Sequence, residues 1–464
     1  MKDISWEEIR YRIETNLPLR LNRNQWKDIK RLLYEIYRRN NTHIEKIIQE
    51  AISDERINKA GGRNKFFVIK DNLIRKRFPL TSSYTKIDTK TIFLAELKEP
   101  LKDAISVKTP FHPEHIFIEK TAENNYLAKR LEKIFPDTPK EKLKYYGEYL
   151  KNHRFSLREL KKPILFIVKE RWDFIKPCPC TKYHLRCNYW IFNLGFGCPF
   201  DCSYCFLQHY ANFPGIVLPA NLDDFFEKFD IFYKKAGNRP IRIGTGEFCD
   251  SLALDNITNY ASQLIKFFSK KNVFFELKTK SNRIENVINT PSSPNIVISW
   301  SLNPQKIVEN EEKGTVSLEE RIESASTVKN KGFSLAFHFD PIIHYEGWEK
   351  AYRKVIDNLY SKIKPPFKWI SLGTLRGARN LKNVVEQRFP QSNIFYGELL
   401  IGEDKKLRYP EFLRKEIYKK MVKWIRRYDD KTPIYLCMEN KDAWSVMDIP
   451  CRSPREIENY LLDT

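Results

Sequence analysis

The sequence has no run of about 18 apolar residues, the length that a membrane-spanning helix needs. It begins MKDISWEEIRYRIE, which mixes acids with bases and has no apolar core, so we expect no secretory signal and a cytoplasmic protein. It also has no internal repeat and no low-complexity segment. Hydrophobic residues make up 42% and charged residues 30% of the 464 residues, a balance that excludes a mainly disordered chain. This length suits roughly two to four domains, or one α/β barrel with attachments.

Acidic residues are too few to balance the basic ones. There are 81 lysines and arginines against 59 aspartates and glutamates, and the net charge is +22. Such an excess favours a polyanionic partner such as nucleic acid, because counterion release drives that binding. The alternative is a lysine-rich composition that only keeps the chain dissolved, and charge alone does not choose between the two.

Cysteine is absent from the first 177 residues, whereas six of the nine cysteines lie between Cys178 and Cys205. A disulfide framework is typical of short secreted chains, in which cysteines are spread out. A dense group in a long chain expected in the cytoplasm favours metal ligation, and thiolates suit zinc or iron–sulfur clusters.

The pattern along the chain predicts four segments. Residues 1–110 read as a basic, mostly helical domain, with capping-box patterns at Ser5/Glu8 and Thr42/Glu45. Its bases and phenylalanines between residues 65 and 78 suit a nucleic acid backbone, or form a solvated basic face. Residues 111–188 are an extension with a cysteine-rich segment, residues 189–393 a barrel, and residues 394–464 a tail with a hairpin, a helix and a strand.

Strands and helices alternate through residues 189–393. The predicted strands are 191–195, 240–245, 273–279, 296–302, 334–339 and 368–372, with helices near 221–236, 256–270, 317–330 and 346–362. This order predicts an α/β fold of parallel βαβ units with right-handed crossovers. Six units do not close an eight-stranded barrel, so we expect a partial (β/α)6 barrel with the tail packed on its open side.

The most specific motif is GCPFDCSYCFLQ, in which Cys198, Cys202 and Cys205 have the spacing CxxxCxxC. It follows the first predicted barrel strand, where loops carry active sites. Three thiolates can hold three irons of a 4Fe–4S cube and leave the fourth iron open to a small molecule. The alternatives are unliganded core thiols or part of a zinc knuckle.

This motif resembles that of the radical S-adenosylmethionine superfamily. From about residue 112 to 440 the chain resembles the spore photoproduct lyase family in its ordered motifs GCPFDCSYCFLQ, RIGTGEFCDSLALD, LKTKSN, ISWSLNP and PIIHYEGWEKAY. The resemblance implies a 4Fe–4S cluster that cleaves S-adenosylmethionine to a 5′-deoxyadenosyl radical, which abstracts hydrogen from a substrate. It also implies a carbon–carbon lyase that repairs a DNA photoproduct, and an electron donor such as flavodoxin or ferredoxin. The competing hypotheses are a radical enzyme that acts on a protein or small molecule, and a nucleic-acid-binding iron–sulfur protein.

The resemblance also assigns residues. It implies cofactor contacts from the GTGE strand end and from the two following strands, namely Gly244, Gly246, Glu247, Lys280, Ser301 and Asn303. It implies hydrogen return by a cysteine on this loop and a relay through tyrosine, for which the chain offers Cys249, about two places from the lyase cysteine, and Tyr204. The chain departs from the lyases at Phe206, where they have a tyrosine, and at the C-terminal hairpin, which here has few aromatic residues. It departs again at His338 and Asp340, which we expect to form a buried pair, either as a structural hydrogen bond or as acid and base on a more polar substrate.

A second group of cysteines, Cys178, Cys180 and Cys187, has the spacing CxCx6C and precedes the first motif. It favours a second metal, either zinc or another iron–sulfur cluster. His184, Cys437 and Cys451 are the candidates for a fourth ligand. The alternative is a set of buried thiols beside the barrel mouth.

Overall fold

The computed structural model describes residues 6–17, 19–181 and 183–463. The chain divides into two compact units. The first, here called the helical unit, joins residues 1–100 with residues 376–410, and the second, the barrel unit, joins residues 101–375 with residues 411–464. The four-part division predicted from the sequence has different boundaries and stays a prediction.

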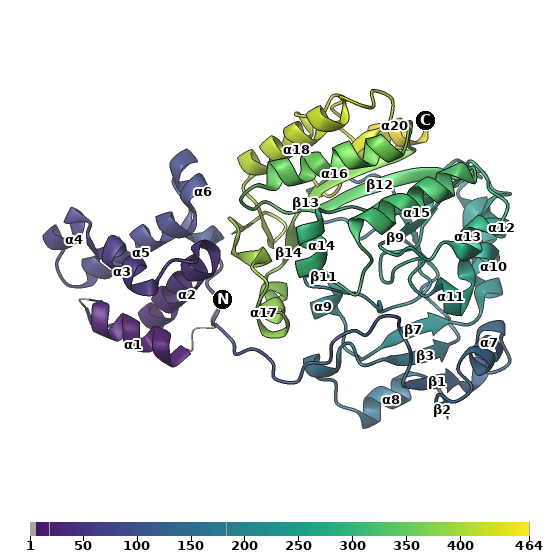
Figure 1. Ribbon diagram of the computed structural model, residues 1–464, viewed down its shortest axis with the longest axis horizontal. Helices are drawn as coiled ribbons and strands as arrows, with labels where there is room; N and C mark the ends of the chain where they lie inside the picture. The colour runs from purple at the N-terminus through teal and green to yellow at the C-terminus, as the bar shows by residue number, and fades with distance from the viewer. Residues whose placement is uncertain (1–5, 18, 182, 464) are drawn as a thin grey trace. The chain divides into compact units, whose positions relative to one another are not determined.

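The helical unit begins with six helices (Figure 1). They are α1 (Trp6–Asn16), α2 (Arg23–Asn40), α3 (Ile44–Ile52), α4 (Glu55–Lys59), α5 (Arg63–Arg77) and α6 (Pro79–Tyr84). A capping box starts α2, because the Asn22 side chain accepts bonds from the amides of Asn24 and Gln25 while the Gln25 side chain accepts from the Asn22 amide. The capping box predicted at Thr42 is wrong, since α3 follows His43 without a side-chain cap. The one predicted at Ser5 lies outside the described residues.

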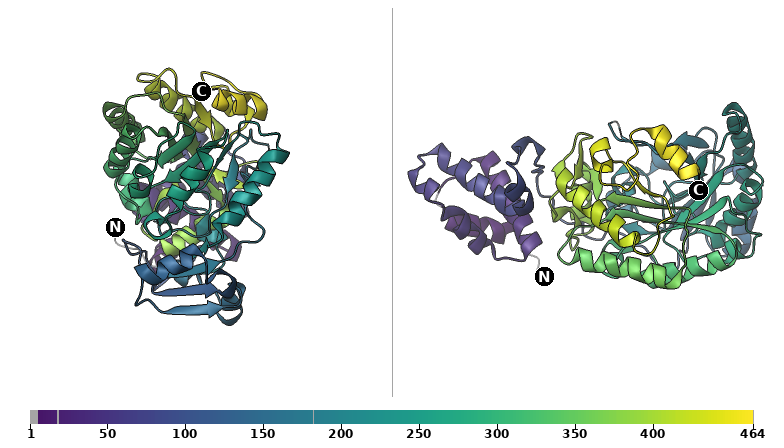
Figure 2. Two further views of the ribbon diagram at one scale, coloured as in Figure 1. Left: turned by 90° about the vertical axis from the view of Figure 1, so that its right-hand side faces the viewer. Right: turned by 90° about the horizontal axis from the view of Figure 1, so that it is seen from above.

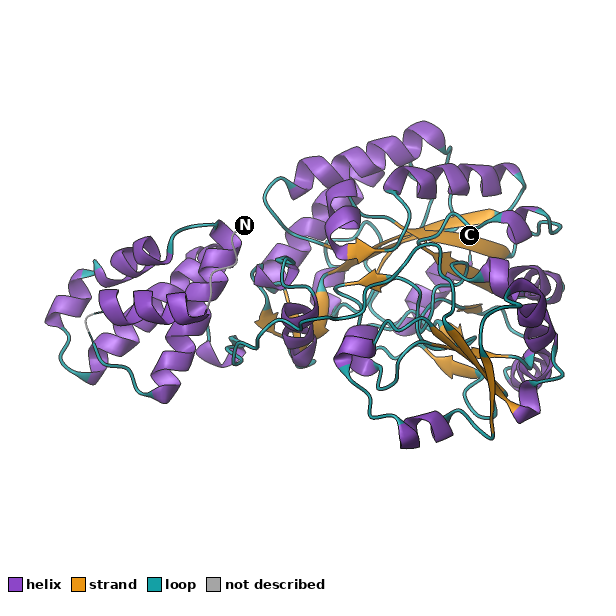
Figure 3. Cartoon of the chain, turned by 60° about the horizontal axis from the view of Figure 1, so that its bottom comes forward, coloured by secondary structure: helices purple, strands orange, loops and turns teal. Residues whose placement is uncertain are grey.

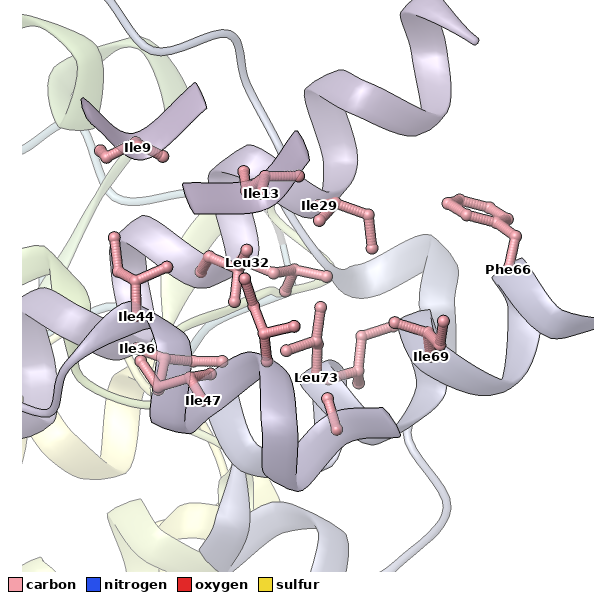
Figure 4. Close-up of a cluster of buried hydrophobic side chains, with 14 of the residues drawn as sticks. Ile9, Ile13, Ile29, Leu32, Ile36, Ile44, Ile47, Phe66, Ile69 and Leu73 are labelled. Carbon is pink, nitrogen blue, oxygen red and sulfur yellow. The ribbon is translucent and has the colours of Figure 1, made fainter. Parts of the chain in front are cut away.

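Apolar residues at helical spacing form the core of this unit (Figure 4). Ile29, Leu32 and Ile36 of α2 recur three and four residues apart, so they share one face of the helix. That face packs against buried residues of its neighbours, which include Ile13 of α1, Ile47 of α3 and Ile69 and Leu73 of α5.

Residues 376–410 add α17 (Arg379–Arg388) and a small antiparallel sheet to the helical unit. The sheet has the order β14 (Arg376–Ala378), β16 (Lys406–Arg408), β15 (Leu400–Ile401). The predicted hairpin is therefore confirmed, as β15 and β16. It belongs to the helical unit, whereas the sequence grouped it with the tail.

Buried ion pairs join α17 to the helices. Glu35 of α2 accepts hydrogen bonds from Arg77 at 2.6 Å and from Lys382 at 2.5 Å. Arg31 of α2 holds both carboxylate oxygens of Glu386, at 2.6 and 2.9 Å. A buried charge without its partner is costly, so segments more than 300 residues apart in the sequence depend on one another for their fold.

The barrel unit is built on one curled sheet of eight strands (Figure 3), in the order β17-β13-β12-β10-β9-β8-β5-β4. The strands are β4 (Ile175–Pro177), β5 (Trp190–Phe192), β8 (Arg242–Gly244), β9 (Phe274–Thr279), β10 (Ile296–Ser301), β12 (Ser334–Ile342), β13 (Trp369–Thr374) and β17 (Ile434–Leu436). All neighbours pair in parallel except β4, which is antiparallel to β5. The six predicted strands are confirmed with shifted ends, and β4 and β17 extend the sheet at its two edges.

Helices pack around the outside of the curled sheet (Figure 2). They include α10 (Leu222–Lys235), α11 (Asp255–Thr258), α12 (Tyr260–Phe268), α13 (Glu285–Ile288), α14 (Gln305–Glu311), α15 (Leu318–Asn330), α16 (Trp348–Lys362), α18 (Glu411–Ile425), α19 (Lys441–Trp444) and α20 (Pro454–Leu462). The helix predicted at 256–270 is two helices, because Asn259 takes a left-handed conformation with φ 51°. Among the described residues, no helix is both long and apolar enough to cross a membrane.

A second sheet of four parallel strands accompanies the barrel. Its order is β2 (Lys140–Leu143), β1 (His115–Glu119), β3 (Ile164–Val168), β7 (Ile216–Pro219), with α7 (Tyr126–Ile134), α8 (Gly147–Asn152) and α9 (Leu207–Tyr210) in the same region of the chain. A two-stranded ladder pairs β6 (Asp201–Cys202) with β11 (Glu312–Lys313).

The loop between β4 and β5 connects the two edges of the curled sheet. It leaves β4 at one edge, yet the amide of Leu185 donates to the carbonyl of Glu439, just beyond β17 at the other edge, at 2.8 Å. Asn188 in the same loop donates to Glu458 of α20 at 2.8 Å. The cysteine-rich segment of residues 178–187 therefore bridges the opening that the partial barrel leaves.

We expect Glu35→Gln to lower the free energy of unfolding of the helical unit by about 3–5 kcal/mol, because it leaves Arg77 and Lys382 buried beside a neutral amide. Burial opposes ionisation of Glu35, but Lys382, Arg31 and Arg77 hold its pKa below the ordinary value. Its stabilisation is thus complete above the unfolded pKa of about 4.3 and is lost as the pH falls through the folded value. Hydrogen exchange of the α2 amides measures the change.

Glu50→Gln is the matched control. Glu50 pairs with Lys76 at 2.5 Å, but its side chain is 44% exposed, so its loss should cost no more than about 1 kcal/mol. Equal effects of the two substitutions would show that the buried network does not hold the unit together.

Candidate active site

The three cysteines of the CxxxCxxC motif follow β5, at the carboxyl edge of the curled sheet. Cys202 ends β6, and its carbonyl accepts a bond from the amide of Cys205 at 3.2 Å. Cys202 is buried, and Cys198 and Cys205 are partly exposed. The loop thus places all three thiols at the sheet edge where parallel α/β folds carry their sites, as predicted.

These thiols share one electrostatic environment. Burial raises the pKa of Cys198 to about 11 and also raises the pKa of Cys202 and Cys205. The other two thiolates raise the pKa of Cys202 further, whereas the ammonium of Lys280 lowers it. Lysines beside grouped thiols are what thiolate ligation requires, because a ligating cysteine is deprotonated and its charge needs compensation.

The donor set fits a cluster rather than a single ion. Within the described part of the chain, no three His, Cys, Asp or Glu side chains converge where one metal ion would bind. In a 4Fe–4S cube each thiolate ligates a different iron, so the thiols surround the cluster and do not meet at a point. Three neighbouring thiols with the ammonium groups of Lys161 and Lys280 nearby match that arrangement.

Lys161 stabilises the cysteine loop through hydrogen bonds to its backbone. Its ammonium donates to the carbonyl oxygens of Cys198 at 3.1 Å and Phe200 at 2.6 Å. Sequence reasoning missed this residue, because nothing near Lys161 in the sequence marks it and its partners lie more than 35 residues further along the chain.

The GTGE turn after β8 packs directly on β9. A Cβ on Gly244 would lie 2.2 Å from the hydroxyl of Tyr189 and 2.3 Å from the carbonyl of Glu276. Gly246 has φ +92°, and a Cβ there would lie 2.9 Å from the carbonyl of Lys278. Both glycines are therefore required by close packing, whatever else they contact.

Asp250 organises the ends of both strands. Its carboxylate accepts bonds from the Thr279 hydroxyl at 2.6 Å and from the amides of Lys280 at 2.8 Å and Ala253 at 2.8 Å. This carboxylate fixes the backbone of Lys280 next to the turn that carries Glu247. Sequence reasoning missed Asp250, although an aspartate in a loop commonly accepts a bond from the amide two residues on, as it does here from Leu252 at 3.0 Å.

Glu247 and Lys280 interact with different charged groups. Glu247 lies 3.9 Å from the ammonium of Lys278. Burial alone would lower the pKa of Lys280, but Cys202 and Glu312 raise it overall, so Lys280 stays cationic beside the cysteine loop. The two predicted cofactor residues thus put a carboxylate and an ammonium close to the thiols.

Asn303 and Tyr204 belong to a buried network around Glu312. Glu312 accepts bonds from the hydroxyl of Tyr204 and from the Asn303 amide at 2.9 Å, and it forms an ion pair with Arg321 at 2.6 Å. Tyr352 donates to the other end of the Asn303 amide at 2.7 Å. Ser301 is buried at the end of β10, next to this network. Asn303 and Tyr204 are therefore tied to protein partners in this structure.

Cys249 lies just after the GTGE turn, where burial raises the pKa of its thiol well above the ordinary value. The thiol of Cys249 donates to the carbonyl of Asp250 at 3.2 Å. Cys249 also lines a cavity shared with Thr258, Tyr260 and Leu264, which come from α11 and α12.

His338 pairs with Glu276, and the expected pairing with Asp340 is wrong. The Nε2 of His338 lies 2.7 Å from a carboxylate oxygen of Glu276, and the indole of Trp369 donates to the same oxygen at 3.3 Å. The parallel register explains the partner: His338 of β12 and Glu276 of β9 lie on one face of the sheet, on strands separated only by β10. Arg242 of β8 is 1% exposed and stacks on Trp369 at 4.2 Å, which makes the lumen of this barrel charged.

The second group of cysteines lies on the loop that bridges the sheet edges. The sulfur atoms of Cys178 and Cys180 are 3.9 Å apart. Burial raises the pKa of Cys187, whereas the charge of Arg242 and a hydrogen bond from the backbone amide of Tyr189 lower it. Among the candidate fourth ligands, His184 contacts Thr181 at 3.3 Å, and Cys451 lies beside Glu456 at α20.

The curled sheet with a cysteine loop at its carboxyl edge defines a class, the partial α/β barrels that carry a thiolate-bound cluster. Within that class, the sequence model "spore photoproduct lyase" matches residues 111–427, more than half of the chain. The chain therefore belongs to the spore photoproduct lyase family. Residues 1–110 lie outside the match, as expected for an added N-terminal part.

Individual proteins support this assignment. The chain is 23% identical to spore photoproduct lyase from Bacillus subtilis strain 168 over 299 residues, which cover 62% of this chain and 85% of the relative. It is 25% identical to spore photoproduct lyase from Clostridium acetobutylicum over 246 residues, which cover 53% and 71%. A solved spore photoproduct lyase complexed with dinucleoside spore photoproduct shares the fold, with a TM-score of 0.62, 21% identity and coverage of 71% of this chain and 100% of that one.

We expect the triple substitution of Cys198, Cys202 and Cys205 by alanine to abolish an oxygen-sensitive 4Fe–4S cluster, because it removes every thiolate of the motif. Anaerobic reconstitution followed by iron analysis and absorption spectroscopy measures the loss. Cleavage of S-adenosylmethionine should stop as well, and a variant that still cleaves it would contradict the assignment.

The same variant tests the second group of cysteines. Metal that stays bound at about one site per chain supports ligation by Cys178, Cys180 and Cys187, and the further substitution of these three by alanine should remove it. A folded triple variant that carries no metal would assign them to packing.

Proposed function

We propose that this protein is a radical S-adenosylmethionine enzyme that repairs a photoproduct in DNA. Membership of the spore photoproduct lyase family, together with three neighbouring thiols at the carboxyl edge of a curled parallel sheet, carries the proposal. A related structure is titled as a mutant with bound AdoMet and dinucleoside spore photoproduct. When bound, the reduced cluster and S-adenosylmethionine supply a 5′-deoxyadenosyl radical that abstracts hydrogen from the substrate.

The residues at the sheet edge would hold these groups. Cys198, Cys202 and Cys205 are the proposed ligands of the cluster. Glu247 offers a carboxylate to the ammonium of the methionyl group, and Lys280 offers its ammonium to the carboxylate. Gly244 and Gly246 are the proposed backbone contacts of the same end of the cofactor, and the absence of side chains at this turn supports that role.

Ser301 and Asn303 are proposed cofactor contacts at the end of β10. The buried position of Ser301 supports its role, since its hydroxyl would meet a ligand out of water. Asn303 already bonds Glu312 and Tyr352, so we propose that it contacts the cofactor through the second N–H of its amide.

Cys249 and Tyr204 are the proposed hydrogen-return residues. The position of Cys249 just after the GTGE turn supports this role, and its thiol is neutral because burial raises its pKa. Only a neutral thiol carries the S–H hydrogen that would be returned. Tyr204 donates its hydroxyl hydrogen to Glu312, so a relay through it requires that bond to open.

We further propose that Cys178, Cys180 and Cys187 ligate a second metal centre. Two sulfur atoms 3.9 Å apart and a third thiol beside buried Arg242 support this, because a guanidinium compensates thiolate charge. An iron–sulfur cluster suits these thiols better than one zinc ion, which requires four ligands at a single point.

The charged lumen favours a second candidate function. Arg242, Glu276 and His338 are buried on the inner face of the sheet, where a polar group of a substrate would find partners. Phe206 also lacks the phenol that the lyases have at this place. A radical reaction on a protein or a polar small molecule is therefore the alternative to photoproduct repair.

Two further expectations belong to the same proposal. The basic residues of the helical unit and the net charge of +22 support DNA as the partner. An oxygen-sensitive cluster and free thiols suit a reducing compartment, which supports a cytoplasmic location, and a small one-electron protein such as flavodoxin or ferredoxin would supply the reductant.

Anaerobic incubation of the reconstituted chain with S-adenosylmethionine, dithionite and irradiated DNA tests the function. We expect 5′-deoxyadenosine to form and the thymine photoproduct to disappear, both followed by chromatography with mass detection. Cleavage of the cofactor with an unchanged photoproduct would favour the alternative substrate class, and no cleavage would leave an iron–sulfur protein without this activity.

Cys249→Ser refines this test. Hydrogen return predicts that the variant still cleaves the cofactor but gives misquenched DNA products, because an O–H bond is a poorer hydrogen donor than S–H. Thr258→Ser is the matched control, since Thr258 lines the same cavity as Cys249 but carries no S–H bond. Normal products from Cys249→Ser would remove this thiol from the mechanism.

A further inference from the structure

The path of the chain changes direction within the four-stranded sheet. From β1 the chain passes through α7 to β2 on one side, whereas β3, which follows α8, pairs with β1 on the other side and leads on to β7. The crossovers that leave β1 and β3 therefore run in opposite directions along a parallel sheet. In such sheets a ligand binds in the crevice outside the carboxyl ends of the two strands at which the order reverses.

A pocket of about 550 Å³ lies at this crevice. It is lined by the last residues of three strands, Glu119 of β1, Val168 of β3 and Pro219 of β7. Residues between 193 and 196 and between 210 and 213, the two segments that flank the cysteine loop, line it as well. Among its described lining residues, none is a proposed cluster or cofactor residue. The pocket is thus a neighbour of the candidate active site and not a part of it.

Aromatic side chains cover the wall of this pocket, which we call the aromatic pocket. They are Tyr145, Tyr146, Trp172, Phe196, Tyr210 and Phe213. The ring centres of Tyr146 and Phe196 lie 6.2 and 5.3 Å from that of Phe213, so these rings form one continuous surface. Trp172 and the three tyrosines are at least partly exposed. They form a patch rather than single exposed rings, and apolar patches of this kind mark binding sites.

Trp172 is 88% exposed, yet hydrogen bonds fix the turn that carries it. The carboxylate of Glu170 accepts bonds from the amides of Arg171 and Trp172 at 2.8 Å and of Asp173 at 3.0 Å. Asn221 accepts from the amide of Glu170 at 2.8 Å and donates to its carbonyl at 2.9 Å. The fold therefore holds a large flat ring in water at the mouth of the aromatic pocket.

Charges around the aromatic pocket are balanced. The charged side chains that line it are met by ion pairs, Glu119 with Arg171, Asp173 with Lys176 and Lys169 with Asp224. The charge of Glu170 is met by the three amides of its turn. The pocket thus selects neither an anion nor a cation, and its rings suit a neutral, flat ligand.

Glu119 excludes a phosphate from the end of β1. Nucleotide-binding sheets place a phosphate at this point, on a glycine-rich turn before the helix that follows the strand. Here the turn reads Glu119-Lys120-Thr121, and the Glu119 carboxylate is 1% exposed. A free nucleotide is therefore less suitable than a base whose phosphates lie outside. The ammonium of Lys151 lies 5.3 Å from the centre of the Tyr145 ring, so a cation is close to a strand that brings a base to this wall.

We propose that the aromatic pocket is a subsite for an unpaired base of the DNA strand, which stacks on Trp172 and the neighbouring tyrosines. The inference rests on the proposed function, because DNA comes to this edge only if it is the substrate of the adjacent site. Stacking on protein rings contributes roughly 1–3 kcal/mol per base and accepts any base, since every base has a flat face. The subsite would therefore hold the strand without reading its sequence.

A protein partner is a less suitable occupant. The volume of the aromatic pocket falls within the ~300–1,000 Å³ of sites for small ligands, so one base fits inside it. A folded protein would instead need a broad surface, of which about 800 Å² per partner is usual in stable complexes.

The test removes the indole with Trp172→Ala. Its ring is exposed and its turn is held by backbone bonds, so the variant should fold normally. Trp172→Phe keeps a flat ring and is the rescue variant. Tyr428→Ala is the matched control, since Tyr428 is also an exposed ring and stacks on Tyr360 of α16. In Figure 1, α16 lies at the opposite end of the barrel unit from β1 and β3.

The measurement is the affinity of the reconstituted full chain for fluorescent single-stranded oligothymidylate, by anisotropy. An oligomer of the same length whose deoxyribose phosphates carry no bases is the second probe. We expect Trp172→Ala to bind oligothymidylate on the order of tenfold more weakly and the abasic oligomer as well as the parent chain does. The loss should persist at high salt, which screens phosphate contacts but not stacking. Trp172→Phe should restore most of the affinity, and Tyr428→Ala should match the parent chain.

Each result decides the proposal. Equal affinity of the parent chain and Trp172→Ala for oligothymidylate would overturn it and leave the ring to a protein partner. An equal loss on both oligomers would overturn it too, because the contact would then be with the backbone. Free thymidine that competes as well as the oligomer would assign the pocket to a nucleoside and also overturn it. Failure of the proposed function is seen separately, as irradiated DNA that the parent chain leaves unrepaired, and the two oligomers still decide whether Trp172 binds a base.

Discussion

The cysteine loop is held through its backbone, which leaves its thiols available. Lys161 bonds two of its carbonyls, the amide of Gly197 donates to Phe248 at 3.0 Å, and the amide of Ser203 donates to Glu311 at 2.8 Å. The antiparallel ladder between β6 and β11 adds a further anchor. Sulfur atoms that are proposed to bind iron cannot also stabilise the loop, so main-chain bonds and a buried lysine take over that task.

The charged lumen follows from a similar constraint on Glu276. Burial opposes ionisation of this carboxylate, but His338, Arg242 and Lys278 hold its pKa below the ordinary value. An anion at that position can persist only with cations and hydrogen bonds around it, and the structure supplies Arg242 from β8, Lys278 from β9 and the His338 ring from β12. The polar inner face is therefore one connected network, and substitution of one member leaves the charges of the others unpaired. This constraint separates the present barrel from one lined by small apolar residues.

The sequence predicted what depends on local patterns. The six inner strands alternate with amphipathic helices, the CxxxCxxC spacing is contiguous, and the hairpin of β15 and β16 is marked by Gly402-Glu-Asp404 between two short strands. It did not predict β4, which has three residues and ends in a proline, or the pairing of His338 with Glu276, 62 residues away on another strand. It also missed Lys161 and Asp250, whose importance comes only from the atoms that they meet in the fold.

The largest surprise for sequence reasoning is that the added N-terminal part is not self-contained. Glu35 depends on Lys382, and Glu398 accepts bonds from the amides of Leu80 at 2.8 Å and Thr81 at 2.7 Å. Deletion of residues 1–110 would strip these partners from residues 376–410 and leave Lys382 and Glu398 as unpaired charges. A loss of DNA affinity after such a deletion would then mix lost phosphate contacts with local unfolding. Substitution of exposed bases and of Phe67, which is 56% exposed, separates the two, because the fold of the helical unit does not rely on them.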